Sequence, residues 1–325
     1  MKRIISTIMI MLLTLSVVTA CGKGDNSEVS GKGVRIYLTL SSGDTFRDAL
    51  VEAAQKKAEE LGATLEPHDA GGSLENQLEH IDEAVKGGYD VIMCNPVDVD
   101  ITLQLQLAAG DIPMIFYNAC PDETRLEADK YVFVGSNEED AGKFQAEYIL
   151  EHFASADTIN MVIMEGQYQH PATLGRSNAL KYGLEDSGKT INYVFDDNAN
   201  WDTDTAKMMF EKFLKTGQPV DCIACNNDAM ALGVLDVCHE QGIDMSQILL
   251  VGVDATADGC AAIETGEMPF TVYQSAIGQG EYAARAAIRL AKGKSLKGMD
   301  YLSEDGKYVW VPFEKVDASN VAEYK

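Results

Sequence analysis

Short apolar runs rich in β-branched residues alternate along this chain with longer segments of helical periodicity, and this alternation constrains the fold most. The first run, VRIYLTL (34–40), is followed by a segment from about Thr45 to Leu61 in which alanine and leucine recur at helical spacing. Strands that alternate with helices form parallel sheets, because a parallel pair needs a long crossover connection. The sequence therefore predicts an α/β protein.

The apolar runs fall into two series of four or five. The first series continues through ATLEPHD, DVIMCNP and IPMIFYN, and the second begins at YVFVGS (131–136) and continues through NMVIMEG, INYVFDD, DCIACNND and LLVGVDA. Two such series predict two doubly wound lobes of parallel sheet. The length of 325 residues agrees with two domains.

The N-terminus has the features of an export signal. Lys2 and Arg3 precede the apolar stretch from Ile4 to Ala20, and no acidic residue occurs before Asp25. The sequence VTAC at residues 18–21 resembles a bacterial lipobox, which implies cleavage of a signal peptide (1–20) before Cys21 and acylation of that thiol. Residues 21–33 contain no apolar cluster and are predicted to be a flexible tether. A plain secretory signal with an incidental cysteine is the alternative.

The charge of the chain excludes one class of partner. Lysine and arginine total 26 against 51 acidic residues, which gives a net charge of −25. A surface of this charge repels phosphates, so we do not expect a nucleic acid as a partner. After the first twenty residues no apolar run is long enough to span a bilayer, so the body of the protein is expected to be soluble.

The cysteines that follow Cys21 are expected to pack in the core. Cys94 and Cys222 stand inside apolar strand-like runs, where a thiol behaves as a small hydrophobic group. Cys222 and Cys225 form a CxxC, but no second pair or histidines at zinc-ligand spacing are evident. Although an even number of cysteines in an exported protein permits disulfides, we favour structural packing for all six, the other three being Cys120, Cys238 and Cys260.

Polar and aromatic residues follow the predicted strands at the points where they end. In open parallel sheets the ligand binds beyond the carboxyl ends of the strands, so these positions outline a site. Taken singly, Asn and Asp at strand ends also cap helices, Trp201 could be a core residue and His170 a turn residue. The candidates are Asp44, Phe46, Asn95, His170, Arg176, Trp201, Asn227, Asp228, Asp254 and Gln274.

NNDAMALG (226–233) is followed later in the chain by VGVDA (251–255). This pair resembles the signature of the second lobe of the type I periplasmic binding proteins, and the chain resembles most closely their galactose/glucose-binding branch. EGQYQHPATLGR keeps the family's six-residue separation of His170 and Arg176, and NANWDT places Trp201 where the branch has its stacking tryptophan. The resemblance extends over about residues 34–300.

The resemblance implies a monosaccharide site between two lobes that close about a three-crossing hinge. The crossings are expected near Phe116–Ala119, Gln274–Ala276 and Lys292–Gly298, so that residues 34–117 plus 275–293 form the first lobe and 118–274 plus 294–325 the second. A pyranose has apolar C–H faces and an edge of hydroxyls that donate and accept hydrogen bonds. Phe46 and Trp201 are expected to cover the faces, and the edge is assigned to Asp44, Asn95, His170, Arg176, Asn227, Asp254 and Gln274.

The implied function is that of a solute-binding lipoprotein of an ABC importer. We expect a monomer without cofactor or metal, held at the outer face of the cell membrane through Cys21, that presents a galactose- or glucose-like hexose or its glycoside to a permease. A sensor kinase or chemoreceptor as partner, and a pentose or another polyol as ligand, remain alternatives. A sugar-responsive repressor would need a DNA-binding helix-turn-helix where the lipobox stands, and no nucleophile elbow, glycosidase acid pair or phosphate loop indicates an enzyme.

Three departures from the branch limit what the resemblance implies. Ala172 replaces the aspartate that holds the anomeric hydroxyl, and Gln274 is one methylene longer than the usual asparagine. The branch's calcium loop is missing before NMVIMEG. The sequence DDNANWDT only begins like such a loop, because Trp201 replaces the required glycine and Lys207 stands where the bidentate glutamate should be, so calcium is rejected.

Overall fold

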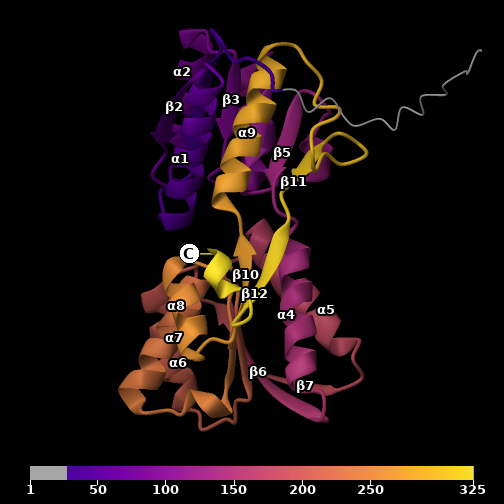
Figure 1. The fold of residues 1–325 in the computed structure, drawn as a ribbon. Helices are drawn as coiled ribbons and strands as arrows, with labels where there is room; N and C mark the ends of the chain where they lie inside the picture. Colours follow the sequence, from indigo (N-terminus) through magenta and orange to yellow (C-terminus); the bar gives the residue numbers. More distant parts are fainter. Residues whose placement is uncertain (1–27, 325) are drawn as a thin grey trace, which may run out of the picture.

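The computed structural model describes residues 28–324, which form two sheets of six strands placed end to end (Figure 1). Cys21 and the predicted signal peptide lie outside the described residues. All neighbouring strands are parallel except β12, which runs antiparallel to β10, so the predicted α/β class is confirmed. The first sheet has the order β11 (Tyr308–Trp310), β5 (Tyr131–Gly135), β4 (Met114–Tyr117), β3 (Val91–Cys94), β1 (Arg35–Leu40) and β2 (Thr64–Asp69). The second has the order β12 (Phe313–Asp317), β10 (Phe270–Gln274), β9 (Leu249–Val251), β8 (Cys222–Cys225), β6 (Thr158–Glu165) and β7 (Thr190–Asn198).

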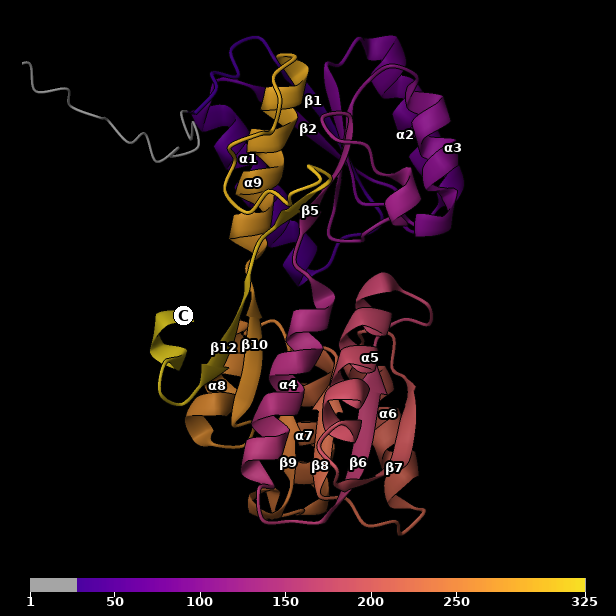
Figure 2. The ribbon, with the colours of Figure 1, turned by 90° about the vertical axis from the view of Figure 1, so that its right-hand side faces the viewer.

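Helices cover both faces of each sheet, which makes two lobes (Figure 2). In the first lobe, α1 packs against α9 on one face and α2 against α3 on the other. In the second lobe, α4 packs against α5 on one face, while α6, α7 and α8 cover the other. The first-lobe helices are α1 (Thr45–Glu60), α2 (Leu74–Gly87), α3 (Thr102–Ala109) and α9 (Ala276–Ala291). The second-lobe helices are α4 (Glu138–His152), α5 (Pro171–Glu185), α6 (Thr203–Leu214), α7 (Asp228–Gln241) and α8 (Ala257–Thr265), and short 3₁₀ turns lie at Val99–Ile101, Glu123–Arg125, Met245–Gln247 and Val321–Tyr324.

The central strands supply two cores, which explains why their sequences are continuously apolar, whereas no residue of the edge strands β2 and β7 is buried. Along β1, Ile36 and Leu38 join the cluster under α1 and α9, whereas Tyr37 between them joins the cluster under α2 and α3. In β6, Val162 and Met161 divide in the same way between the two faces of the second sheet. Alternate side chains on a strand point to opposite faces, so a sheet covered on both sides must be apolar at every position.

The structure corrects two of the three predicted crossings between the lobes. YVFVG does not open the second sheet but forms β5 of the first, where Met114 of β4 pairs with Tyr131. The chain therefore first crosses after β5, at Ser136 and Asn137, and not near Phe116–Ala119. The third crossing lies at residues 311–312, between β11 and β12, because Leu296 is buried in the first lobe and β11 pairs with β5. The second crossing lies between β10 and α9, at the predicted place.

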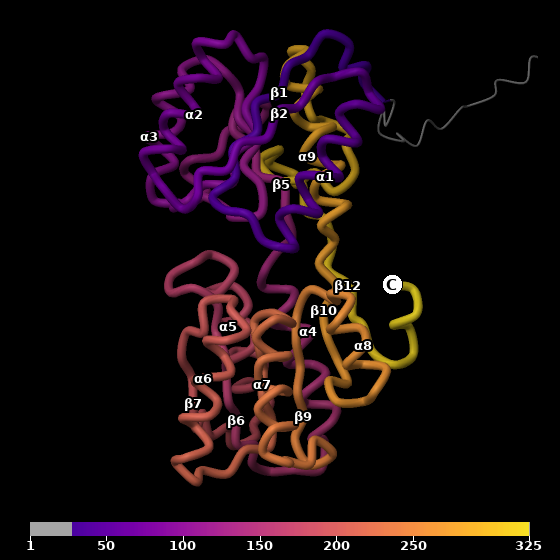
Figure 3. Tube along the Cα trace, turned by 90° about the vertical axis from the view of Figure 1, so that its left-hand side faces the viewer, coloured from indigo at the N-terminus to yellow at the C-terminus, as the bar shows by residue number. Residues whose placement is uncertain are grey.

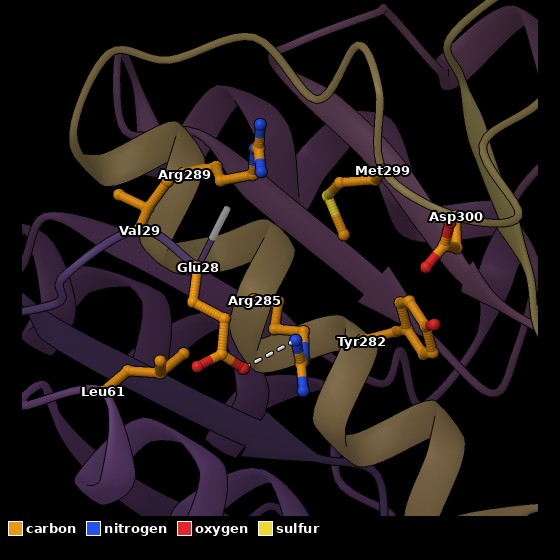
Figure 4. Close-up of a pocket in the computed structure, with 8 residues that line it drawn as sticks. All are labelled: Glu28, Val29, Leu61, Tyr282, Arg285, Arg289, Met299 and Asp300. Atoms are coloured by element: carbon orange, nitrogen blue, oxygen red, sulfur yellow. Dashed lines mark ion pairs between the residues drawn. The ribbon is translucent and has the colours of Figure 1, made fainter. Parts of the chain in front are cut away.

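The segment 28–33, predicted to be part of a flexible tether, packs on the first lobe. Glu28 forms an ion pair of 2.8 Å with Arg285 of α9, and Val29 packs against the core under α1 and α9 (Figure 4). Gly31 is buried and its N–H donates to the carbonyl of Leu61 at 2.7 Å. The tether prediction was wrong for these residues because Val29 and the buried glycine allow the chain to lie close to α1 and α9.

None of the cysteines within the described residues forms a disulfide. Cys94 and Cys222 are fully buried inside strands, as predicted, and Cys120 is partly buried. Burial raises the pKa of the Cys120 thiol to about 12. Between residues 28 and 324, the helices are all too short or too polar to cross a membrane.

Candidate functional site

A cavity of about 430 Å³ lies between the two lobes, with walls from both. Its volume is in the range of small-molecule sites. Most of the predicted ligand-binding residues line it, namely Asp44 and Phe46 from the first lobe and His170, Arg176, Trp201, Asn227, Asp254 and Gln274 from the second. The carboxyl ends of the strands in each sheet point toward the other lobe, which can be followed in the trace of Figure 3.

Several of these residues also cap the helix that follows their strand. The N–H of Arg47 donates to Asp44 at 2.7 Å, and the N–H of Met230 donates to Asn227 at 3.0 Å. His170 caps α5 by accepting from the N–H of Ala172 through Nδ1 at 3.2 Å. A residue at the end of a strand lies next to both the cavity and the first turn of the following helix. The same residue can therefore cap the helix and line the cavity.

The ring of Trp201 forms part of the second-lobe wall. It meets the ring of His170 edge to face with centroids 5.6 Å apart, and its backbone carbonyl accepts from Nδ2 of Asn227 at 3.3 Å. Its backbone has a φ of 64°, and that of Asp254 has a φ of 121°, both unusual for residues other than glycine. Such conformations cost free energy and persist where surrounding contacts hold them.

Arg176 is the most connected side chain at the cavity. Its Nε donates to Oε2 of Glu138 at 2.7 Å, its Nη1 to the carbonyl of Asn226 at 2.6 Å, and its Nη2 to Oε1 of Gln274 at 3.1 Å. Nη1 also lies 3.8 Å from Asp254. Burial opposes the positive charge, but the pairing with Glu138 and Asp254 outweighs burial and raises the pKa of Arg176.

Burial controls the protonation of the groups around Arg176. It raises the pKa of Asp254 well above its usual value and raises that of Glu138, although Arg176 acts in the opposite direction on both. Burial, with Arg176 and Arg47 nearby, lowers the pKa of His170 to about 4. His170 is therefore neutral at pH 7, which its capping of α5 through an unprotonated Nδ1 requires.

Two adjacent groups on this wall lack hydrogen-bond partners among the described residues. Nε2 of Gln274 is buried and donates to nothing, while the carboxyl group of Asp254 has a long ion pair of 3.8 Å with Nη1 of Arg176 but no hydrogen bond within the described residues. The two residues are neighbours, because the N–H of Gln274 donates to the carbonyl of Asp254 at 3.2 Å. A buried polar group without a partner costs about 1–3 kcal/mol, so this wall can bind a ligand that both donates and accepts.

Asn95 differs from the prediction, because it is not among the residues that line the cavity. Its side chain is 2% exposed. Oδ1 accepts from the N–H and the hydroxyl of Ser41 at 3.2 and 2.6 Å, and Nδ2 donates to the carbonyl of Tyr117 at 3.2 Å. These hydrogen bonds of the Asn95 amide connect the ends of β1, β3 and β4.

Asp228, another strand-end candidate, is fully buried and also lies outside the cavity wall. It accepts from the N–H of Thr256 at 2.8 Å and from the hydroxyl of Thr271 at 2.6 Å. Burial raises its pKa to about 6. These bonds hold the loop that carries Asp254.

The cavity also contains residues that the sequence reasoning missed. Arg47 pairs with Asp44 at 2.8 Å and donates through Nη1 to the hydroxyl of Ser41 at 2.7 Å. Glu138 faces the cavity beside Arg176. Glu138 comes three residues after β5, so the rule applied to the ends of the other strands would also have found it. Within residues 28–324, no cluster of three or more His, Cys, Asp or Glu could hold a metal ion.

Comparison with known proteins places this fold among solute receptors. Residues 36–295 match the family model described as "Periplasmic binding protein domain". The chain is 30% identical over 286 residues to a Rhizobium meliloti protein named "Putative rhizopine-binding protein", a match that covers 87% of this chain and 89% of that protein. It is 24% identical to the D-galactose/methyl-galactoside binding periplasmic protein of Haemophilus influenzae, over 97% of this chain and 98% of that protein.

Solved structures have the same fold. An ABC transporter solute binding protein from Bacillus halodurans with bound myo-inositol superposes with a TM-score of 0.80 and 26% identity, over 90% of this chain and 98% of that chain. A periplasmic solute binding protein from Actinobacillus succinogenes with bound D-allose has a TM-score of 0.77 and 20% identity, over 90% and 100% of the two chains. The predicted two-lobe architecture is thus shared by solved proteins of this class.

Proposed function

The chain belongs to the periplasmic binding protein family, and on that premise we propose that it captures a monosaccharide-sized neutral polyol between its lobes for an ABC importer. Our first candidate ligand is a galactose- or glucose-like hexose or its glycoside. The ligand is bound and released without chemical change. The protein is a receptor and not an enzyme.

The observation that carries this proposal is the pair formed by Asp254 and Gln274. The carboxyl group of Asp254, which has only its long ion pair with Arg176 within the described residues, can accept from a donor, and the unpartnered Nε2 of Gln274 needs an acceptor. A hydroxyl both donates and accepts, so two neighbouring hydroxyls of a polyol satisfy both groups. A ligand that lacks one of them leaves a buried group without a partner, which costs about 1–3 kcal/mol and is a source of selectivity.

The rest of the cavity fits an uncharged ring. Phe46 and Trp201 come from opposite lobes, so closure can bring an aromatic surface to each apolar face of a sugar. Both arginines of the cavity are already paired with carboxylates, Arg47 with Asp44 and Arg176 with Glu138. An anionic sugar would therefore enter the cavity without a free cation to pair with its charge.

A cyclic polyol without an anomeric centre is a second candidate, with myo-inositol as its representative. Ala172 lines the cavity and offers no acceptor for an anomeric hydroxyl, which is a group that distinguishes sugars from cyclitols. The Bacillus halodurans protein, 26% identical to this chain, was solved with myo-inositol bound. Curated relatives with names for galactose, xylitol and ribose support a polyol more strongly than any single sugar.

We further propose that the mature protein is a monomeric lipoprotein anchored through Cys21 outside the cell membrane. Closure of the lobes is then the signal that a permease, or alternatively a sensor kinase or chemoreceptor, recognises. Labelling of growing cells with a fatty acid tests the anchor. Wild-type protein should take up the label and the Cys21→Ser variant should not.

A thermal-shift screen of residues 28–325 tests the proposed ligand class. Galactose, glucose, methyl galactoside, xylose, ribose and myo-inositol form the panel, with glucuronate as the anionic comparison. A ligand bound only by the folded state raises the melting temperature through mass action. We expect at least one neutral polyol to do so and glucuronate to have no effect.

Variants of Asp254 and Gln274 then test the site. Asp254→Asn and Gln274→Leu should each weaken the best polyol by about tenfold or more, as measured by titration calorimetry. Asp236→Asn, an exposed aspartate on α7, is the control and should bind like the wild type. Failure of every neutral polyol to bind, or unchanged affinity in both cavity variants, contradicts the proposal.

A further inference from the structure

Arg176 lies beside the second-lobe end of each of the three crossings between the lobes. Its first partner, Glu138, begins α4 directly after the first crossing, and its partner Gln274 is the last residue of β10 before the second. The third crossing leads into β12, whose first residue, Phe313, has its ring centroid 5.7 Å from Cζ of Arg176. One guanidinium therefore contacts the three segments that must rotate when the lobes close.

The same guanidinium faces the cavity. Its Cζ lies 5.5 Å from the ring centroid of Trp201, and its Nη1 forms a long ion pair of 3.8 Å with the carboxyl group of Asp254. A ligand that binds Asp254 and Gln274 changes the surroundings of Arg176 and, through Arg176, the contacts at the crossings. Cavity and hinge are thus joined by one side chain.

Glu138 fixes the position of Arg176. The two form a buried ion pair, with their side chains 11% and 4% exposed. Helices α4 and α5 can approach closely enough for this pair because glycines stand at the contact. A Cβ at Gly142 would lie 2.2 Å from the carbonyl oxygen of Arg176, and one at Gly175 would lie 2.7 Å from Cβ of Glu138.

The first-lobe ends of the crossings are also tied to one another. Nε2 of Gln279 in α9, next to the second crossing, donates to the hydroxyl of Ser136 at the first, at 3.0 Å. A Cβ at Gly278 would lie 3.1 Å from Val311, at the third crossing. With both ends held, rotation is confined to the short pieces between them, around Asn137, Ser275 and Pro312.

We propose that Glu138 is a positioning residue which, by holding Arg176, sets both the affinity for the polyol and the rigidity of the hinge. The part that concerns affinity rests on the proposed function. The part that concerns the hinge does not, because the contacts at the crossings exist without a ligand. The polyol site and the three crossings then both depend on the orientation of the same guanidinium, so a change at one affects the other.

Hydrogen exchange followed by mass spectrometry tests the hinge on the ligand-free chain of residues 28–325. Glu138→Gln keeps the shape of the side chain but removes its charge. Exchange in the peptides that contain residues 136–138, 274–276 and 311–313 should rise by about tenfold or more, since a buried cation loses its partner. Exchange in β8, in the centre of the second sheet, should stay at the wild-type rate.

The matched control is Glu139→Gln, one residue along α4, whose side chain is 63% exposed and pairs with Lys143. It should leave exchange at all three crossings unchanged. Glu138→Asp keeps the charge and should restore part of the protection from hydrogen exchange at the crossings. It is measured in place of Glu138→Gln if Glu138→Gln does not fold. Equal acceleration throughout the second lobe, or a change at the first crossing alone, overturns the proposal.

Titration with myo-inositol and D-galactose tests the affinity. Glu138→Gln should weaken the probe that binds the wild type by about tenfold or more, and Glu139→Gln should not. Unchanged affinity in Glu138→Gln overturns this part. If neither probe nor any other polyol of the panel binds the wild type, the proposed function fails, while the exchange at the crossings still decides the role of Glu138 in the hinge.

Discussion

The ring of Trp201 occupies the space that a side chain at Gly166 would fill. A Cβ built at Gly166 would lie 2.1 Å from Cζ2 of the tryptophan, which no real contact allows. Gly166 directly follows β6, and its N–H donates to Oδ1 of Asn226 at 3.0 Å, so the backbone there cannot move away freely. Because Gly166 has no side chain, the ring of Trp201 can occupy this position in the cavity wall.

We predict that Trp201→Ala weakens polyol binding by about 2–4 kcal/mol, because a large aromatic surface at the cavity is lost. Gly166→Ala should weaken binding as well, since the new methyl group displaces the ring. Titration calorimetry measures both. If the Trp201→Ala variant is partly unfolded but its folded fraction binds with wild-type affinity, then Trp201 is a core residue and does not contribute to the cavity wall.

Fluorescence provides an independent check on Trp201. The other tryptophan, Trp310, stacks on Tyr308 in the first lobe with centroids 4.7 Å apart and is not part of the cavity wall. Ligand should therefore change the emission of Trp201 alone. A ligand response that survives in Trp201→Ala would contradict this assignment.

His170 predicts a dependence of stability on pH. Its pKa in the folded chain is about 4, below the ordinary 6.5, so between these values the unfolded chain takes up a proton that the folded chain does not. Stability contributed by neutral His170 is therefore complete above pH 6.5 and is lost as the pH falls toward 4. The loss is at most about 1.4 kcal/mol for each pH unit.

The variant His170→Asn isolates this effect, because asparagine keeps a side-chain acceptor for the cap of α5 and does not titrate. Denaturant unfolding between pH 7 and 4.5 should show a smaller loss of stability in His170→Asn than in the wild type. His152→Asn, at the exposed end of α4, is the control. Parallel curves for His170→Asn and the wild type would refute the prediction.

Ala172 predicts tolerance toward glycosides. It lines the cavity beside His170 and presents no acceptor that a capped anomeric oxygen would leave unpaired. Methyl β-galactoside or methyl β-glucoside should therefore bind within about tenfold, or about 1.4 kcal/mol, of the free sugar. Ala172→Asp should restore a preference for the free sugar. Competition titrations on the wild type and the variant test this prediction. If the wild type binds both glycosides about a hundredfold more weakly than the free sugars, then Gln167 or Gln169 binds the anomeric hydroxyl instead.

The packed segment 28–33 predicts where the stable domain begins. A chain that starts at residue 34 loses the contact of Val29 with the core, the Gly31 to Leu61 hydrogen bond and the Glu28–Arg285 ion pair. Its melting temperature should lie below that of residues 28–325, by an amount that reflects about 1–3 kcal/mol. Arg285→Ala in the longer chain should cost much less, because a partly exposed ion pair contributes little. Equal melting temperatures for the two chains would mean that the segment adds no stability.

The sequence by itself determined the α/β class and most of the cavity wall. Strands buried on both faces must be apolar at every position, so VRIYLTL and DVIMCNP can be recognised without a structure. Parallel strands end at one edge of their sheet, so residues such as His170, Trp201 and Asp254 could be grouped although they are far apart in the chain. These features depend on local pattern and on a rule that holds for every open parallel sheet.

Only the tertiary structure decided which sheet β5 joins, where the chain crosses between lobes and how the buried charges pair. YVFVG is apolar enough for either sheet, and its place is decided by pairing with β4 on one side and with β11, near the end of the chain, on the other. Asn95 follows a strand as the other candidate residues do, yet its side-chain amide forms hydrogen bonds with Ser41 and Tyr117 and does not line the cavity. Glu138 becomes significant only because α4 and α5 pack closely enough to bury it against Arg176. Contacts between residues far apart in sequence depend on the packing of whole helices and sheets, and local sequence patterns carry no record of that packing.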